Sequence, residues 1–308
     1  MGILKACSGK KAIDNLLSVC YGEYIGKAGS NRMKVLTEKK YINSNGNRIK
    51  LLVLKPDIPE QGKKRPGVLW IHGGGYVTGM AEMVYMSRAV HLVRKYGITV
   101  ISPAYRLSGK APYPAALIDC HHALLYMKKH TEEFGIREDQ IMVGGESAGG
   151  GLAAALCMYA KDKRTVNIAY QMPLYPMIDN EDTETSRDNH APVWNTRRNH
   201  YGWRQYLKGI SGGKVSAYAA PARRKDYSGL PPAYTFVGTA EPFYAETKAY
   251  VRKLQEAGVE AKIDIYPDMF HAFDMLLPFL PVSRKAAERF EKQFEYAMAH
   301  YFSEQEET

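Results

Sequence analysis

The chain has 308 residues, 45% of them hydrophobic, which is enough to bury one large core as a single α/β domain. Its net charge of +10 raises the question of a nucleic-acid or membrane-surface partner, but the basic residues form short, scattered clusters without a nucleic-acid motif. Four cysteines without paired metal-ligand spacing argue against a disulfide scaffold and indicate a reduced, cytoplasmic protein.

The first 45 residues lack the strand-like runs of the rest of the chain. Their apolar residues recur at helical spacing and do not form the continuous stretch of a secretion signal; they include Ile13, Leu16, Leu17, Cys20, Tyr21 and Tyr24. No run approaches the length that spans a membrane. We therefore expect residues 1–45 to be an N-terminal cap segment, with no secretion signal.

Seven short β-like runs follow, with helical stretches between most of them. They cover residues 49–54, 68–71, 99–102, 141–143, 170–174, 234–237 and 263–266. This alternation predicts the α/β fold class, with a mostly parallel central sheet covered by helices on both faces. The main domain would consist of residues 46–179 and 229–308, with its site at the carboxyl ends of the strands.

The second β-like run ends in the tetrapeptide His72-Gly73-Gly74-Gly75. A loop of this kind offers unshielded backbone N–H groups to an oxyanion. Gly73 and Gly74 are therefore the expected donors. The alternative interpretation is that the glycines form only a turn.

The segment Gly145-Glu146-Ser147-Ala148-Gly149 lies between a β-like run and a helical stretch rich in small residues. This is typical of the sharp strand-to-helix turn that holds a serine nucleophile. The two flanking glycines let neighbouring backbone crowd the turn, so the hydroxyl of Ser147 is expected to point outward. The N–H of Ala148, near the positive end of the helix, is the expected third oxyanion donor. The pattern predicts an acyl-transfer hydrolase.

Residues 180–228 interrupt the alternation because they are polar, aromatic and poor in strand signals. We expect a cap insertion here, which would form a lid together with residues 1–45. Four aromatic residues are candidates to line the pocket beneath it, with plain packing as the alternative: Trp194, Tyr201, Trp203 and Tyr206.

The acid and the base are expected downstream, because hydrolases of this architecture present serine, carboxylate and histidine in that order. Glu241 and His271 each follow a β-like run. An imidazole that titrates near 6.5 can take the proton of Ser147 and return it, while a carboxylate fixes its tautomer. The other candidates for the acid are Asp179, Glu246, Asp264 and Asp268, the last of which is too near His271 along the chain.

Five motifs follow one another along the chain: His72-Gly73-Gly74-Gly75, Tyr105-Arg106-Leu107, Pro112-Tyr113-Pro114-Ala115-Ala116-Leu117, residues 145–150 and His271-Ala272-Phe273. Together they resemble the hormone-sensitive-lipase-like (bacterial family IV) esterases of the α/β-hydrolase superfamily. The resemblance implies the α/β-hydrolase fold with a helical cap. It also implies Ser147 as nucleophile, Glu241 in the usual place of aspartate and His271 as base, with Gly73, Gly74 and Ala148 as oxyanion donors.

The resulting hypothesis is a cytoplasmic serine carboxylesterase that hydrolyses short-chain acyl esters, such as acetyl esters, through an acyl-enzyme. We expect no cofactor and no metal, since His121-His122 has no matching partners for zinc. The expected partner is a small-molecule ester, without nucleic acid or stable membrane insertion, and the chain is compatible with a homo-oligomer. The alternative is a catalytically retired, esterase-like small-molecule receptor, against which the intact triad argues.

Overall fold

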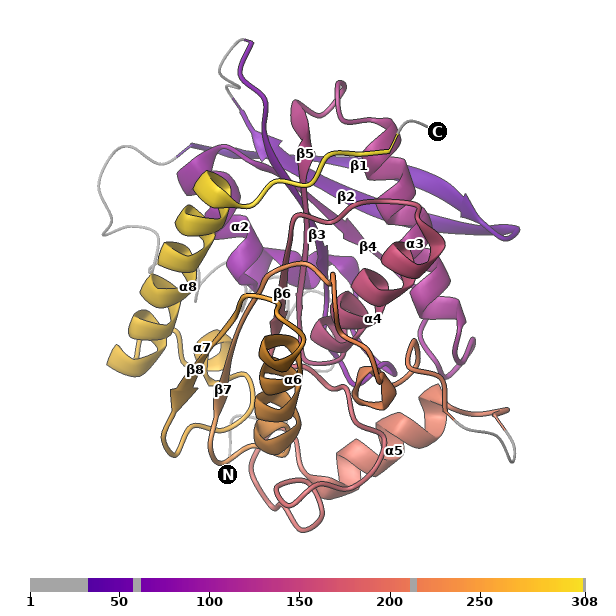
Figure 1. The fold of residues 1–308 in the computed structure, drawn as a ribbon, viewed down its shortest axis with the longest axis vertical. Helices are drawn as coiled ribbons and strands as arrows, with labels where there is room; N and C mark the ends of the chain where they lie inside the picture. The colour runs from indigo at the N-terminus through magenta and orange to yellow at the C-terminus, as the bar shows by residue number, and fades with distance from the viewer. Residues whose placement is uncertain (1–32, 58–61, 211–214, 307–308) are drawn as a thin grey trace, which may run out of the picture. The chain divides into compact units, whose positions relative to one another are not determined.

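The computed structural model describes residues 33–57, 62–210 and 215–306. Its central element is an eight-stranded sheet with the order β1-β2-β4-β3-β5-β6-β7-β8 (Figure 1). The strands are β1 (Val35–Ser44), β2 (Asn47–Pro56), β3 (Arg65–Ile71), β4 (Thr99–Pro103), β5 (Ile136–Glu146), β6 (Tyr170–Leu174), β7 (Ala233–Gly238) and β8 (Ala261–Tyr266).

The sheet is mostly parallel, as the sequence predicts. Every neighbouring pair from β4 to β8 in the spatial order is parallel, whereas β2 runs antiparallel to both β1 and β4. Each of the seven predicted β-like runs lies within one of the strands β2 to β8. The carboxyl ends of the parallel strands therefore meet at one edge of the sheet, where a site is expected.

Helices cover both faces of the sheet. The helices in the described residues are η1 (Ala81–Met86), α2 (Arg88–Tyr96), α3 (Ala115–Lys129), α4 (Ala148–Lys163), α5 (Thr196–Tyr206), η2 (Pro221–Arg223), α6 (Tyr244–Glu256), α7 (Phe273–Leu276) and α8 (Pro281–His300). In Figure 1, α2 and α8 lie beside one another, and α3 and α4 lie on the other side of the sheet.

Strand β3 shows how one stretch of sequence supplies both cores. Val68 and Trp70 pack into the cluster that contains residues of α2 and α8, while Leu69 and Ile71 pack into the cluster of α3 and α4. All four side chains are fully buried. Because successive side chains of a strand point to opposite faces, a continuous apolar run is what a strand covered on both sides requires.

The predicted boundary after residue 45 is wrong for residues 35–44, which form strand β1 at the edge of the sheet. The strand pairs along its whole length with β2, for example through Ile42 and Ile49. Its outer position leaves Lys39 and Tyr41 exposed, so it lacks the apolar run that marks the inner strands. Residues 1–32 of the predicted cap segment lie outside the described residues.

Between β6 and β7 the chain contains the helix α5 and the short helix η2, consistent with the poor strand signal of residues 180–228. The assignment of these residues to a cap remains a prediction. Within the described part of the chain, no helix is long and apolar enough to cross a membrane.

Candidate active site

Three residues predicted for the site follow the carboxyl ends of three parallel strands. Ser147 comes directly after β5, Glu241 follows β7 and His271 follows β8. These strands lie in the order β5-β6-β7-β8, so their ends share one edge of the sheet. The fold thereby brings together three residues that are far apart in the sequence.

The side chains of these residues are hydrogen-bonded in series. Nε2 of His271 is 2.9 Å from Oγ of Ser147, and Nδ1 is 2.5 Å from Oε2 of Glu241. The second carboxylate oxygen, Oε1, accepts the backbone N–H of Gly238 at 3.1 Å. A carboxylate behind Nδ1 favours a proton on that nitrogen, which leaves Nε2 free to accept the serine hydroxyl proton.

The backbone at Ser147 has the strained conformation expected of a nucleophile turn. Its φ of 58° and ψ of −122° lie in a region that residues with a Cβ rarely adopt. A Cβ on Gly149 would stand 2.0 Å from the carbonyl oxygen of Ile71, so only glycine permits this close approach of α4 to β3. Only 6% of Ser147 is exposed, and the outward direction expected for its hydroxyl stays a prediction.

The other candidates for the acid have different partners. Asp179 forms an ion pair with Arg223, and its carboxylate also accepts the backbone N–H of Glu181. Burial raises the pKa of Asp179 from its ordinary value. Its carboxylate therefore has a structural partner of its own.

The remaining three acids are also placed away from the imidazole contact. Oε1 of Glu246 accepts the backbone N–H groups of residues 178 and 179 at 2.7 and 3.2 Å, which fixes the chain after β6. Asp264 accepts a hydrogen bond from the hydroxyl of Tyr234 at 2.8 Å. Asp268 is exposed. Glu241 is the candidate that contacts His271.

The glycine loop after β3 packs directly against the nucleophile turn. A Cβ on Gly73 would stand 3.2 Å from Cβ of Ser147 and 3.0 Å from the carbonyl oxygen of Glu146. Ala148, the first residue of α4, follows Ser147 in the chain. Gly73 and Ala148 thus lie next to Ser147, and the role of the three expected oxyanion donors stays a prediction.

His72 fixes the start of this loop, although the sequence analysis assigned it no role. Its Nδ1 is 2.8 Å from the carbonyl oxygen of Gly73, and its ring stacks on Tyr105 with centroids 4.2 Å apart. The hydroxyl of Tyr105 donates to the carbonyl oxygen of His72 at 2.9 Å. Burial lowers the pKa of His72 to about 4, so the ring is neutral near pH 7.

Three aromatic rings from the described part of the chain lie near His271. The ring centroids of Tyr175 and Phe243 are each 5.1 Å from that of the imidazole, and the centroid of Trp194 is 6.3 Å away. Tyr175 and Phe243 are fully buried. Sequence reasoning missed these two, although each lies shortly after a strand end, where site residues of such sheets gather.

The four aromatic residues of the insertion have different environments. Trp194 lies near His271, as above, whereas Tyr201 is 49% exposed. Trp203 and Tyr206 are buried and pack against Tyr76, with ring centroids 5.4 and 3.9 Å from it. Only the first of the four is placed beside the proposed base.

Sequence reasoning also missed two buried acidic residues, Glu146 and Asp274, of which Glu146 directly precedes Ser147. Oε2 of Glu146 accepts the indole N–H of Trp70 at 2.8 Å, and burial raises the pKa of Glu146 to about 8. The nearby carboxylate of Asp274 is paired with Arg88 at 2.9 Å. The carboxyl of Glu146 is therefore mainly protonated at neutral pH.

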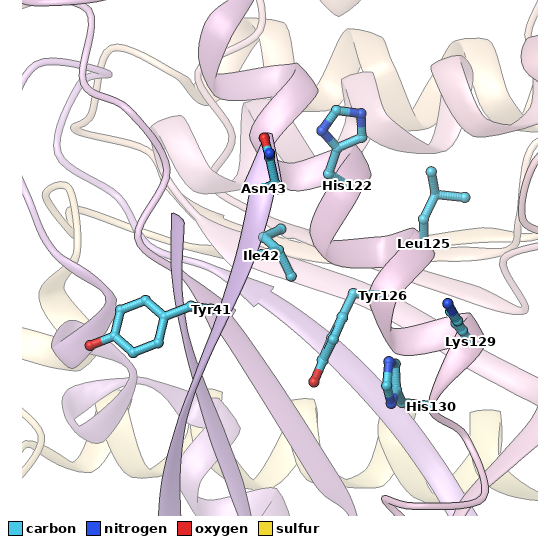
Figure 2. Close-up of a pocket in the computed structure, with 8 residues that line it drawn as sticks. All are labelled: Tyr41, Ile42, Asn43, His122, Leu125, Tyr126, Lys129 and His130. Atoms are coloured by element: carbon cyan, nitrogen blue, oxygen red, sulfur yellow. The ribbon is translucent and has the colours of Figure 1, made fainter. Parts of the chain in front are cut away.

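A surface hollow of about 350 Å³ lies away from these residues, between β1 and α3 (Figure 2). It is lined by Tyr41, Ile42, Asn43, His122, Leu125, Tyr126, Lys129 and His130. Nδ1 of His122 is 3.0 Å from Oγ of Ser44, which indicates a packing role. Among the described residues, no group of three or more histidine, cysteine, aspartate or glutamate side chains could hold a metal ion.

Comparison with known proteins relates this arrangement to esterases. The family model described as the alpha/beta hydrolase fold matches residues 68–275. Esterase LipI and carboxylesterase NlhH, both from Mycobacterium tuberculosis, are each 30% identical to this chain; the alignments cover 76% and 73% of this chain and 73% and 71% of the relatives. The solved structure of a bacterial heroin esterase has a TM-score of 0.82 and 30% identity, covering 94% of this chain and 90% of that one.

Proposed function

Because this chain belongs to the hormone-sensitive-lipase-like esterases of the α/β-hydrolase superfamily, we propose that it hydrolyses carboxylic esters with short acyl groups through an acyl-enzyme on Ser147. Acetyl esters are the first substrates to test. The observation that carries the proposal is the series of hydrogen bonds from Ser147 through His271 to Glu241, at 2.9 and 2.5 Å.

The proposed reaction has two half-reactions. Oγ of Ser147 attacks the ester carbonyl carbon while Nε2 of His271 takes the hydroxyl proton. The tetrahedral intermediate collapses, the bond to the alcohol oxygen breaks, and His271 returns the proton to that oxygen. Water, deprotonated by the same nitrogen, then attacks the carbonyl carbon of the acyl-enzyme. The bond from that carbon to Oγ of Ser147 breaks, His271 returns the proton to Oγ, and the carboxylic acid leaves. Water is the only co-reactant that this sequence requires.

Glu241 would orient the imidazole and stabilise the imidazolium that forms, without itself becoming protonated. The backbone N–H groups of Gly73, Gly74 and Ala148 would stabilise the oxyanion of the tetrahedral intermediate. Loss of one such donor typically lowers kcat about 10²–10³-fold. The packing of Gly73 against Ser147 supports this role for the loop.

We also propose that the protein is cytoplasmic, because the number and spacing of its cysteines argue against a fold stabilised by disulfides. Cys120 and Cys157, the two that lie in the described residues, are buried free thiols.

The decisive experiment compares Ser147→Ala with the parent enzyme on p-nitrophenyl acetate and p-nitrophenyl butyrate. The substitution should lower kcat by about 10⁶, because the members of a triad act as a unit. Ser228→Ala, which changes an exposed serine on the loop before β7, is the matched control and should keep full activity. A parent that cleaves no ester would favour the receptor hypothesis, and an active Ser147→Ala variant would remove this residue as the nucleophile.

A further inference from the structure

Trp194, from the insertion between β6 and β7, contacts both sides of the proposed catalytic centre. Its ring centroid lies 6.3 Å from that of His271 and 6.4 Å from that of Phe243. On the other side, a Cβ added to Gly75 would stand 2.1 Å from Cη2 of the indole. One side chain therefore reaches from the glycine loop to the proposed base.

The backbone that carries this tryptophan is strained. Val193 has a φ of 71°, which is unusual for a β-branched residue, and the N–H of Trp194 donates to the carbonyl oxygen of Pro192 at 2.8 Å. These features define a γ-turn of the rare, strained kind. Such strain persists where the surroundings hold it and is common at ligand-binding sites.

The indole is also held at its far end. Its Nε1 lies 3.4 Å from Oδ1 of Asn199, a residue of α5 that is only 2% exposed. The helix α5 is itself packed on the glycine loop, since a Cβ on Gly202 would stand 2.9 Å from the carbonyl oxygen of Gly75. The indole ring is therefore held in a fixed position between the glycine loop and His271.

We propose that Trp194 determines specificity by limiting the size of the alcohol portion of the ester. This inference rests on the proposed function. The leaving alcohol oxygen must come within hydrogen-bond reach of Nε2 of His271 to receive its proton, so the chain attached to it lies beside the imidazole. The aromatic rings beside that imidazole restrict the same space.

Among these rings, Trp194 is the one that substitution can remove with the least disturbance. Tyr175 and Phe243 are fully buried parts of the core, whereas Trp194 is half-buried and comes from the insertion. Its replacement by alanine would open space beside His271. The hydrogen bonds that join Ser147, His271 and Glu241 would stay in place. Esters of small alcohols are therefore the substrate class that the parent enzyme should prefer.

The test uses a pair of isomeric esters in which the same six-carbon chain is placed on opposite sides of the carboxyl group. Hexyl acetate carries it on the alcohol and methyl heptanoate carries it on the acyl group, with methyl acetate as the common reference. Values of kcat/KM are measured for each ester by titration of the released acid. Tyr201→Ala, which removes an exposed aromatic ring of the same insertion, is the matched control.

In Trp194→Ala, the kcat/KM for hexyl acetate relative to methyl acetate should rise by about 10-fold or more, as expected when a few methylene groups gain apolar space. The ratio for methyl heptanoate should stay within about 2-fold of the parent value, and Tyr201→Ala should change neither ratio. Trp194→Phe should give a smaller rise in the hexyl acetate ratio, and serves as the test if the alanine variant does not fold.

An unchanged hexyl acetate ratio, or a rise confined to methyl heptanoate, would overturn the assignment while leaving the proposed function intact. A parent enzyme that cleaves none of the three esters would instead overturn the proposed function, and the assignment with it. The two failures are therefore distinguishable in the same set of measurements.

Discussion

Replacement of Glu146 by glutamine would remove a buried ionisable group beside the proposed nucleophile while keeping the size of the side chain. Glu146 is 4% exposed and its Oε2 accepts the indole N–H of Trp70 at 2.8 Å, a hydrogen bond that a glutamine oxygen can also accept. Burial raises the pKa of Glu146 from 4.5 to about 8. The substitution therefore isolates how the protonation of this one carboxyl group contributes to the free energy of unfolding.

The sign of the effect follows from the direction of that shift. Between pH 4.5 and about 8, the folded protein keeps a proton on Glu146 that the unfolded chain has released. The free energy of unfolding therefore falls as the pH rises through this window, and the loss is complete above the folded-state pKa. At about 1.4 kcal/mol per unit, the part of the window above pH 5 corresponds to about 4 kcal/mol.

We expect the difference in free energy of unfolding between Glu146→Gln and the parent to change by about 4 kcal/mol in favour of the variant from pH 5 to pH 9. Urea unfolding followed by tryptophan fluorescence at pH 5, 7 and 9 measures this difference. Glu256→Gln, whose parent side chain is 65% exposed, is the control and should follow the parent. Parallel pH profiles for Glu146→Gln and the parent would refute the reasoning.

Three further predictions concern the same site. Glu241→Gln should lower kcat on p-nitrophenyl acetate by about 10⁴ while Asp179→Asn keeps most activity, and the reverse outcome would transfer the acid role. Burial lowers the pKa of His72 from 6.5 to about 4. The contribution of this group to the free energy of unfolding is therefore fully present above pH 6.5 and should fall by about 3 kcal/mol as the pH drops to 4. Urea unfolding should show a smaller fall in His72→Asn, and an equal fall would exclude this histidine as the cause. Gly149→Ala should cost about 1–3 kcal/mol in the same assay because its Cβ would meet backbone of β3, whereas Gly109→Ala, with open space around it, should not.

The inner strands of the fold could be predicted from the sequence because burial on both faces requires continuous apolar runs. Strand β3 is such a run, and its ends were placed to within a few residues. Strand β1 was missed for the same reason, since an edge strand with charged residues such as Glu38 and Lys39 carries no such run. Its pairing with β2 depends on tertiary contacts that a local pattern does not encode.

For the site, the sequence indicated the residues whose chemistry is tied to a local backbone shape. The glycines around Ser147 and the loop at Gly73 are required by close backbone approach, which leaves a recognisable pattern. The burial of Ser147 and the position of Trp194 could not be predicted in this way. The position of Trp194 depends on how the insertion packs against the glycine loop, a contact between segments more than 100 residues apart.

The geometry also shows how a glutamate fits a position where the family resemblance implies an aspartate. The longer side chain of Glu241 folds back on its own loop, so that Oε1 accepts the N–H of Gly238 while Oε2 faces Nδ1 of His271. The extra methylene is thus accommodated by an anchor only three residues upstream. Because the carboxylate is fully buried, water competes little for it, and in the proposed mechanism its attraction to an imidazolium at His271 would be stronger than at the surface. Asp179, the other candidate for the acid, forms its ion pair with Arg223 instead.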